Sequence, residues 1–143
     1  MGRRVLGVDV GDRRVGLAIS DVSRTLARPL STLKVTDAAD AVDRVVKTIN
    51  ALIMDEDGLD TIVVGLPARL DGTPTDATTR VTTFIAALRQ RTALPIATED
   101  ERLSSREAES RLAVRERDWR KRKLKLHAAA AAVILQDYLD KQA

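Results

Sequence analysis

The sequence contains no cysteine and very few aromatic residues. The absence of cysteine excludes disulfide bonds and metal sites built from thiolates. Phe84, Trp119 and Tyr138 are the only residues of their kinds, so the core has to be built from valine, leucine, isoleucine and alanine. Because proteins that stack single-stranded nucleic acid on their surface need several aromatic side chains, we do not expect that kind of binding surface.

Long apolar runs are also missing. The longest, Ala128 to Leu135, is far shorter than the roughly 20 residues that cross a membrane, and no charged-then-apolar leader opens the chain. We therefore expect a cytoplasmic protein without membrane contact. Its 143 residues, 44% hydrophobic and 31% charged, fit one globular domain over residues 1–143.

The net charge of +3 is unevenly distributed. Residues 115–125, RERDWRKRKLK, contain seven Lys or Arg and two acids, whereas the rest of the chain contains 17 and 19. One basic patch on a nearly neutral body favours a polyanionic partner such as nucleic acid. A solvated charged loop is the alternative interpretation of this stretch.

Apolar patterning predicts five strands, over Val5–Val10, Val15–Ser20, Leu30–Val35, Thr61–Leu66 and Leu94–Thr98. The first two form a hairpin, and the uninterrupted apolar run of the fourth is typical of a parallel strand covered on both faces. Four helices are expected: one capped by Thr36 or Asp37, one after the Asp71-Gly72 turn, one from Ser104 to Leu112, and one over His127–Leu139. This order predicts an α/β fold that begins with antiparallel strands and continues with parallel crossovers.

Asp9 lies inside the apolar first strand, where an unpaired carboxylate is costly. Strand alternation places Asp9 on the same face as Gly7 and Gly11, and next to Gly16 and Ala18 of the partner strand if the hairpin has no bulge. This face is almost free of side chains, which leaves room for a cation, a phosphate or both. The alternative is an aspartate that is merely hydrogen-bonded near a strand end.

Two further segments are candidates to complete a site with Asp9. Glu99, Asp100 and Glu101 follow the fifth predicted strand, and parallel sheets bind ligands at the carboxyl ends of their strands. A solvated loop whose carboxylates stabilise the next helix N-terminus is equally consistent. His127, the only histidine, is predicted at the start of the last helix, where the helix dipole favours neutral imidazole, the form that binds metals or accepts protons. A lone histidine there is more often a capping or packing residue.

Four motifs occur in order along nearly the whole chain: Asp9-x-Gly11-x-x-Arg14-x-Gly16-x-Ala18, Val64-Gly65-Leu66-Pro67 followed by Asp71-Gly72, Asp100-Glu101-Arg102-Leu103-Ser104-Ser105, and an alanine-rich helix with Ile134-Leu135-Gln136-x-Tyr138-Leu139. Each is weak alone, but the ordered set resembles the YqgF family, described both as Holliday junction resolvases and as nucleases of precursor ribosomal RNA. That family is similar to the RuvC resolvases and has a ribonuclease H-like fold. The resemblance implies a mixed five-stranded sheet, three antiparallel strands followed by two parallel ones, flanked by helices.

In this family, acidic residues from the first strand, the end of the fifth strand and the start of the last helix meet around divalent metal. By position these correspond to Asp9, Glu101 and His127, and the family usually has aspartate where this chain has His127. RuvC-type resolvases instead place a glutamate at the end of the fourth strand, where this chain reads Val64 to Pro67. Because Mg²⁺ prefers oxygen ligands and Mn²⁺ tolerates imidazole better, the resemblance implies a Mg²⁺ or Mn²⁺ site with one negative charge fewer.

The resemblance implies a metal-dependent endonuclease on structured nucleic acid, which processes the 5′ end of precursor 16S ribosomal RNA or, as the alternative, resolves Holliday junctions in branched DNA. Asp9 would bridge one or two ions, Glu101 would hold a second ion or orient water, and His127 would bind a metal or act as general base. The predicted phosphate-binding residues are Arg14, Arg102, Arg120, Lys121, Arg122, Lys123 and Lys125. Arg14 and Arg102 are equally consistent with ion pairs that hold the acids in place. We expect a monomer or a homodimer.

Two other functions stay open at this point. A nucleic-acid-binding protein whose catalysis was lost with the histidine at position 127 would bind its target without cutting it. An ATP-binding domain of the actin and Hsp70 class also opens with Asp-x-Gly and a hairpin around phosphate. That fold needs a second, duplicated domain, which 143 residues cannot hold.

Overall fold

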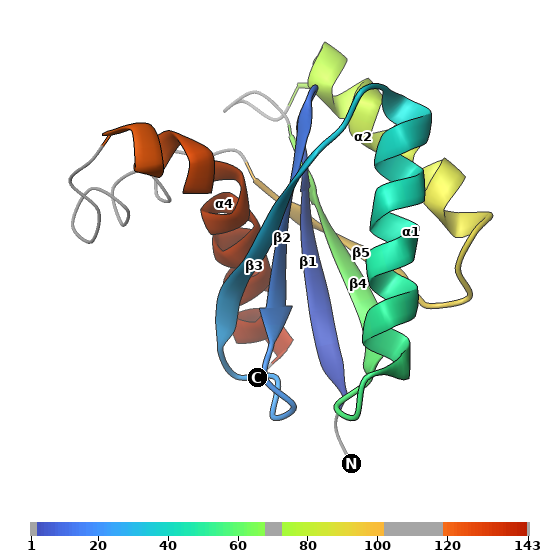
Figure 1. The fold of residues 1–143 in the computed structure, drawn as a ribbon, viewed down its shortest axis with the longest axis vertical. Helices are drawn as coiled ribbons and strands as arrows, with labels where there is room; N and C mark the ends of the chain where they lie inside the picture. Colours follow the sequence, from blue (N-terminus) through green and yellow to red (C-terminus); the bar gives the residue numbers. More distant parts are fainter. Residues whose placement is uncertain (1–2, 68–72, 102–118, 143) are drawn as a thin grey trace.

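The computed structural model describes residues 3–67, 73–101 and 119–142. Within these ranges the chain forms one five-stranded sheet and three helices (Figure 1). The strands are β1 (Arg4–Val10), β2 (Arg14–Ser20), β3 (Ala27–Lys34), β4 (Leu59–Leu66) and β5 (Ile96–Asp100). The helices are α1 (Ala38–Met54), α2 (Asp76–Arg89) and α4 (Trp119–Gln142).

The order of the strands in the sheet is β3-β2-β1-β4-β5. β3, β2 and β1 are antiparallel neighbours, whereas β4 pairs in parallel with β1 and β5 pairs in parallel with β4. This arrangement confirms the expected mixed sheet. The predicted hairpin register is also confirmed, because Asp9 lies opposite Gly16 and no bulge interrupts the pairing of β1 with β2.

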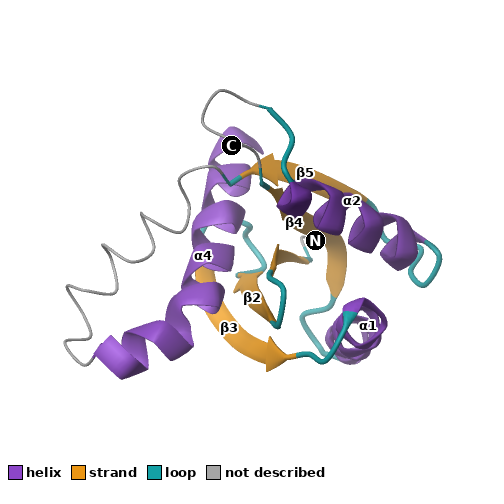
Figure 2. Cartoon of the chain, turned by 90° about the horizontal axis from the view of Figure 1, so that it is seen from above, coloured by secondary structure: helices purple, strands orange, loops and turns teal. Residues whose placement is uncertain are grey.

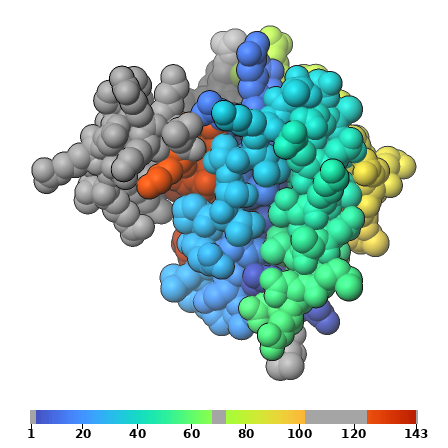
Figure 3. All heavy atoms as spheres, in the orientation of Figure 1, coloured from blue at the N-terminus to red at the C-terminus, as the bar shows by residue number. Residues whose placement is uncertain are grey.

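Large aliphatic side chains fill the face of the sheet under α1 and α2. Leu6, Val8 and Val10 of β1 point to this face, as strand alternation requires, and pack against the buried side of α1. α1 begins after Asp37, whose carboxylate accepts a hydrogen bond of 2.8 Å from the Asp40 N–H. In the space-filling view, β3 and α1 make up most of the near side (Figure 3). The large residues therefore form the main core.

The opposite face of the sheet is covered by α4 (Figure 2). Small residues line this face where the helix crosses it. A Cβ on Gly7 would lie 2.8 Å from the Cβ of Leu135, and a Cβ on Gly16 would lie 2.0 Å from the carbonyl oxygen of His127. Real Cβ atoms do not come so close to other atoms, so these two glycines are what allows the α4 backbone to approach the sheet.

The predicted ends of two strands are wrong. β3 begins at Ala27 instead of Leu30, because Pro29 lies inside this edge strand, next to an irregularity in the pairing with β2. Such an irregularity on an edge strand tolerates a residue that lacks the backbone N–H. β5 ends at Asp100 and not at Thr98, which places the acidic segment within and directly after the strand.

The predicted start of the last helix is also wrong. α4 begins at Trp119, eight residues before His127, because the basic stretch consists mostly of good helix formers and carries no apolar period by which a helix could be predicted. The predicted Asp71-Gly72 turn and the helix from Ser104 to Leu112 lie outside the described residues. In the part of the chain that is described, no helix is long and apolar enough to span a membrane.

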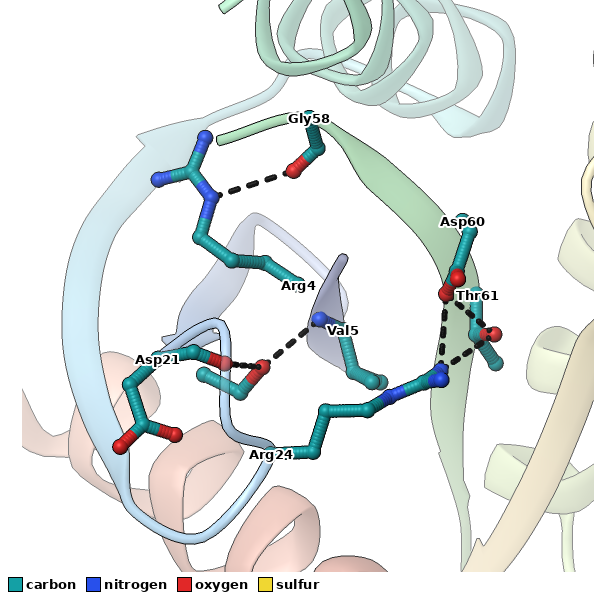
Figure 4. A network of polar contacts seen from close by, with 8 residues as sticks. Arg4, Val5, Asp21, Arg24, Gly58, Asp60 and Thr61 are labelled. Atoms are coloured by element: carbon teal, nitrogen blue, oxygen red, sulfur yellow. Dashed lines mark hydrogen bonds and ion pairs between the residues drawn. The ribbon is translucent and has the colours of Figure 1, made fainter. Parts of the chain in front are cut away.

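Two arginines tie strands together at the end of the sheet where β1 and β4 begin (Figure 4). Arg24, in the turn between β2 and β3, donates hydrogen bonds of 2.7 Å to Asp60 and 2.9 Å to the Thr61 hydroxyl. Arg4 is buried at the start of β1 and donates to the carbonyl oxygen of Gly58 at 3.1 Å. These contacts fix the starts of the two central strands.

Candidate active site

Asp9 is the second-to-last residue of β1 and lies on the face of the sheet that α4 covers. Only 8% of the residue is exposed. The glycines beside it do not leave an open floor, because atoms of α4 occupy the space over Gly7 and Gly16. The prediction that these two glycines make room for a cation or a phosphate is therefore wrong. The side chains that approach Asp9 are those of Glu101 and His127.

Glu101 reaches Asp9 from a strand that is not a neighbour of β1. It directly follows β5, and its N–H points to the carbonyl oxygen of Leu66 at 3.4 Å. β4 lies between β5 and β1, and a Cβ on Gly65 of β4 would lie 2.6 Å from Glu101 Oε2. The Glu101 side chain therefore passes over β4 at Gly65 and forms a hydrogen bond with Asp9.

The electrostatics of this acid pair are unfavourable to two full negative charges. Burial raises the pKa of Glu101 to about 9, helped by the charge of Asp9, the hydrogen bond to Asp9 and the charge of Asp100. At neutral pH Glu101 therefore keeps its proton and donates it to the Asp9 carboxylate. Among the described residues, no positive side chain contributes to this pKa, so within this part of the chain the proton is what compensates the contact of the two acids.

His127 lies beside Asp9, with its Nδ1 3.7 Å from Asp9 Oδ2 and one third of its side chain exposed. The turn after β1 packs against the ring, because a Cβ on Gly11 would lie 3.1 Å from His127 Cε1. The prediction that His127 lies at a helix start is wrong. It lies in the third turn of α4, where the field of the helix N-terminus has faded and no longer acts on the imidazole.

Contacts in the second half of α4 fix the helix, and with it His127, on the sheet. Gln136 accepts a hydrogen bond of 2.9 Å from the Ala27 N–H and donates another of 2.9 Å to a carbonyl oxygen in the turn before β3. At the other side of the sheet, Lys141 donates to the carboxylate of Glu99, whose side chain is 7% exposed. The helix is thus attached to both ends of the strand order, at β3 and at β5.

Of the three predicted acids at the end of β5, the structure brings only Glu101 to Asp9. Glu99 lies on the same face but pairs with Lys141, so its charge is used to attach α4. Asp100 is exposed, and its negative charge helps to raise the pKa of Glu101.

Of the two predicted phosphate-binding arginines in the motifs, the structure describes Arg14 but not Arg102. Arg14 is the first residue of β2 and shares the α4 face with Gly16 and Ala18. It is half-buried, and its side chain forms no hydrogen bond or ion pair with the described residues. The alternative role of Arg14, an ion pair that holds the acids, is therefore not observed. Arg102 lies outside the described residues.

The predicted basic patch is helical where the structure describes it. Four of its residues lie in the first turns of α4, which project past β3 in Figure 2: Arg120, Lys121, Arg122 and Lys123. Lys125 follows them in the helix and is exposed. The interpretation of residues 119–125 as a charged loop is therefore wrong.

The metal site expected from the resemblance is present only as a donor set. The described residues include no group of three or more His, Cys, Asp or Glu side chains placed as a ready metal centre. Asp9 and Glu101 do place two carboxyl groups in contact, and His127 adds an imidazole. Hard divalent cations accept oxygen donors of this kind, and a cation that displaces the Glu101 proton would compensate both charges. The donor set therefore fits a divalent metal.

Gly65 also belongs to the site, and sequence analysis named it only as part of the Val64-Gly65-Leu66-Pro67 motif, without a role. The signal that identifies it is a glycine in an otherwise aliphatic, fully buried strand. That signal does not say what approaches the glycine, because the answer depends on which strand lies between the two acids.

Comparison with known proteins places this geometry in a family. The model of the RuvX family, described as Holliday junction resolvase, matches residues 3–141. A protein of Thermoanaerobacter pseudethanolicus named "Putative pre-16S rRNA nuclease" is 38% identical over 141 residues, with 97% of each chain covered. A Geobacillus kaustophilus protein of the same name is 39% identical over 137 residues, which cover 96% of this chain and 97% of the relative.

Two solved structures of low sequence identity share the fold. RuvC of T. thermophilus, in complex with a Holliday junction substrate, has a TM-score of 0.56 at 17% identity, covering 98% of this chain and 95% of that one. The fowlpox virus Holliday junction resolvase has a TM-score of 0.52 at 14% identity, covering 98% and 99%. These likenesses confirm the expected ribonuclease H-like architecture. Together with the family match over nearly the whole chain, they show that this protein belongs to the RuvX family, the YqgF family of the sequence motifs.

Proposed function

We propose that this protein is a metal-dependent endonuclease that hydrolyses phosphodiester bonds in structured nucleic acid. The observation that carries the proposal is the contact between Asp9 and Glu101, two carboxyl groups from strands that are not neighbours, with His127 beside them. Burying two acids together costs stability unless a proton or a cation compensates them. A bound divalent metal would compensate the two buried acids and so offset this cost.

The proposed roles follow from where each side chain lies. Asp9 and Glu101 would hold Mg²⁺ or Mn²⁺, with His127 as a further ligand or as the general base. When bound, the metal supplies Lewis-acid stabilisation of charge on the phosphate oxygens. Glu101 has to release its proton before it binds the metal. Arg14, on the same face, would contact a phosphate of the substrate.

The basic patch of residues 115–125 would bind the nucleic-acid backbone next to the cleaved bond. Contacts of lysine and arginine with phosphates are independent of base sequence and weaken as the salt concentration rises. The patch therefore supports affinity for nucleic acid in general, and it does not choose between RNA and DNA.

The substrate that we favour is the 5′ end of precursor 16S ribosomal RNA, cut in the cytoplasm by a monomer or a homodimer. The support is that relatives 38% and 39% identical carry the name of a nuclease for this RNA. Branched DNA is the alternative, supported by the description of the family and by its structural neighbours. Cutting a junction needs two coordinated sites, and the described residues supply one acid pair.

Cleavage assays test the proposal. The purified protein is incubated with Mn²⁺ or Mg²⁺ and with either a precursor RNA or a four-way DNA junction. We expect metal-dependent cutting of the RNA, and loss of cutting in Asp9→Asn, because this variant loses a negative charge at the metal site. Cutting of the junction alone would select the DNA alternative. Binding without cutting under either metal would support a protein that has lost its catalysis.

The variant His127→Asp tests whether the histidine limits catalysis. It restores the carboxylate usual in the family, so we expect a higher rate with Mg²⁺ and a smaller preference for Mn²⁺. Rates that do not change with either metal would place His127 outside the chemistry.

A further inference from the structure

Glu101 and Asp9 have to meet across a strand that separates them. Neighbouring strands lie 4.7–4.9 Å apart, so β5 and β1, on either side of β4, are separated by about 10 Å. Both acidic side chains point to the α4 face. Gly65 pairs with Glu99, two residues before Glu101, and the Glu101 carboxyl group lies directly over Gly65 on its way to Asp9. The contact between the acids therefore depends on what β4 presents on this face.

The space above Gly65 is occupied by the ends of two side chains. A Cβ at this position would lie 2.6 Å from Oε2 and 3.1 Å from Cδ of Glu101, and 2.5 Å from Cδ1 of Ile134. The separations of 2.6 Å from Glu101 Oε2 and 2.5 Å from Ile134 Cδ1 are shorter than real Cβ atoms tolerate. Even the smallest side chain at position 65 would therefore force the Glu101 carboxyl group to move.

Gly65 differs in this respect from the glycines that allow α4 to approach. A Cβ on Gly16 would meet the backbone of His127 in α4, and a Cβ on Gly7 would meet the Ala131 carbonyl oxygen as well as Leu135. Side chains there would push the whole helix. At Gly65 only flexible side-chain ends are in the way, so the fold can accept a methyl group while the acid pair cannot.

We propose that Gly65 is a positioning residue that acts through Glu101: the missing side chain in β4 keeps open the path by which Glu101 reaches Asp9. A side chain at position 65 separates the two carboxyl groups and leaves the fold intact. The effect on the acid contact is independent of function, whereas the effect on metal binding rests on the proposed function.

The first test is Gly65→Ala in the full chain, with Mn²⁺ binding measured by calorimetry. Residues that orient a metal ligand typically change affinity by 10- to 100-fold, and we expect a loss of about this size with a thermal midpoint close to that of the unchanged protein. His127 is the only histidine, so the broadening of its ring signals in NMR spectra by Mn²⁺ reports independently whether the ion still binds beside it. Unchanged affinity and unchanged broadening would overturn the proposal.

Two further variants separate the effect on Glu101 from an effect on packing. Ile134→Val removes the Cδ1 atom that the new methyl group would meet, so adding it to Gly65→Ala relieves the packing conflict only. We expect the loss of Mn²⁺ affinity to persist in this double variant, and full recovery would contradict the proposal. In a Glu101→Ala background, Gly65→Ala should cause no further loss, because a residue that acts through Glu101 has no effect without it.

A crystal structure of metal-free Gly65→Ala distinguishes a failure of this inference from a failure of the proposed function. A Glu101 carboxyl group displaced from Asp9 supports the positioning role, even if the unchanged protein binds no Mn²⁺ and cuts no nucleic acid. An acid pair still in contact overturns it, even if the nuclease activity is real.

Discussion

The two faces of the sheet are packed in opposite ways. Under α1 and α2, β1 and β2 present large residues such as Val8 and Leu17, both fully buried. Under α4 the same strands present Gly7 and Gly16. Two helices thus rest on bulky side chains on one face, whereas one helix rests almost on the backbone of the strands on the other.

The α1/α2 face contributes mainly to the stability of the fold, whereas the α4 face sets the geometry of the candidate site. Buried aliphatic side chains supply most of the hydrophobic free energy of folding, and they lie mainly on the α1/α2 face. The α4 face contributes less apolar bulk, but its small residues determine how close His127 comes to Asp9 and whether Glu101 can cross β4. The candidate active site is therefore built largely where side chains are missing.

The largest change in stability is expected from shortening a large side chain on the α1/α2 face. Leu17→Ala should lower the free energy of unfolding by about 2–5 kcal/mol, because it leaves a cavity in the main core. Urea denaturation measures the loss. Mn²⁺ binding by the folded variant should match that of the unchanged protein, since Leu17 points away from the acids. Weakened binding would show that the two faces are not separable.

The converse experiment adds a side chain on the α4 face, where the structure has a glycine. Gly16→Ala should lower the free energy of unfolding by about 1–3 kcal/mol, because the new methyl group meets the backbone of α4. The ring signals of His127 in NMR spectra should shift with the helix. Gly65→Ala is the matched control, since its methyl group meets only side-chain ends. Equal stability of Gly16→Ala and the unchanged protein would contradict the close packing of α4.

The last of the three effects, with only a lower bound on its size, concerns the cost of the acid pair itself. The folded-state pKa of Glu101, about 9, lies above the ordinary value of 4.5, so its contribution to stability is fully present below pH 4.5 and is lost as the pH rises towards 9. Glu101→Gln keeps a donor and removes this loss. The metal-free variant should be more stable at pH 8 by at least about 1 kcal/mol.

Thermal or urea unfolding across the pH range checks this prediction. The two proteins should have similar stability near pH 4, where Glu101 is protonated in the folded and unfolded states alike. An unchanged difference in stability from pH 4 to pH 8 would mean that Glu101 is not held protonated beside Asp9.

Alternation within strands was sufficient to predict the two faces and the hairpin register around Asp9. It was not sufficient to interpret Gly7 and Gly16, because a glycine in a strand marks close approach without naming what approaches. Here the approaching atoms belong to α4, more than 100 residues later in the chain. The sequence therefore predicted a space, and the structure fills it with a helix.

The sequence predicted which residues form the candidate site, but it did not predict how the strands and α4 bring them together. Asp9, Glu101 and His127 were assigned from the ordered motifs, and the structure places them together. Their catalytic and metal-binding roles stay predictions. The start of α4 was missed because its basic first turns have no apolar period, and the role of Gly65 was missed because it depends on the strand order β1-β4-β5.

The acidic run at the end of β5 has three acids in succession, and the alternation of the strand turns Glu99 and Glu101 to the α4 face and Asp100 to the opposite one. A shift of one residue in the pairing of β5 with β4 would turn Asp100 towards β1 in place of Glu101. Aspartate is one methylene shorter and would have the same gap to bridge. The register in which β5 pairs with β4 therefore matters for the site as much as the identity of any single acid.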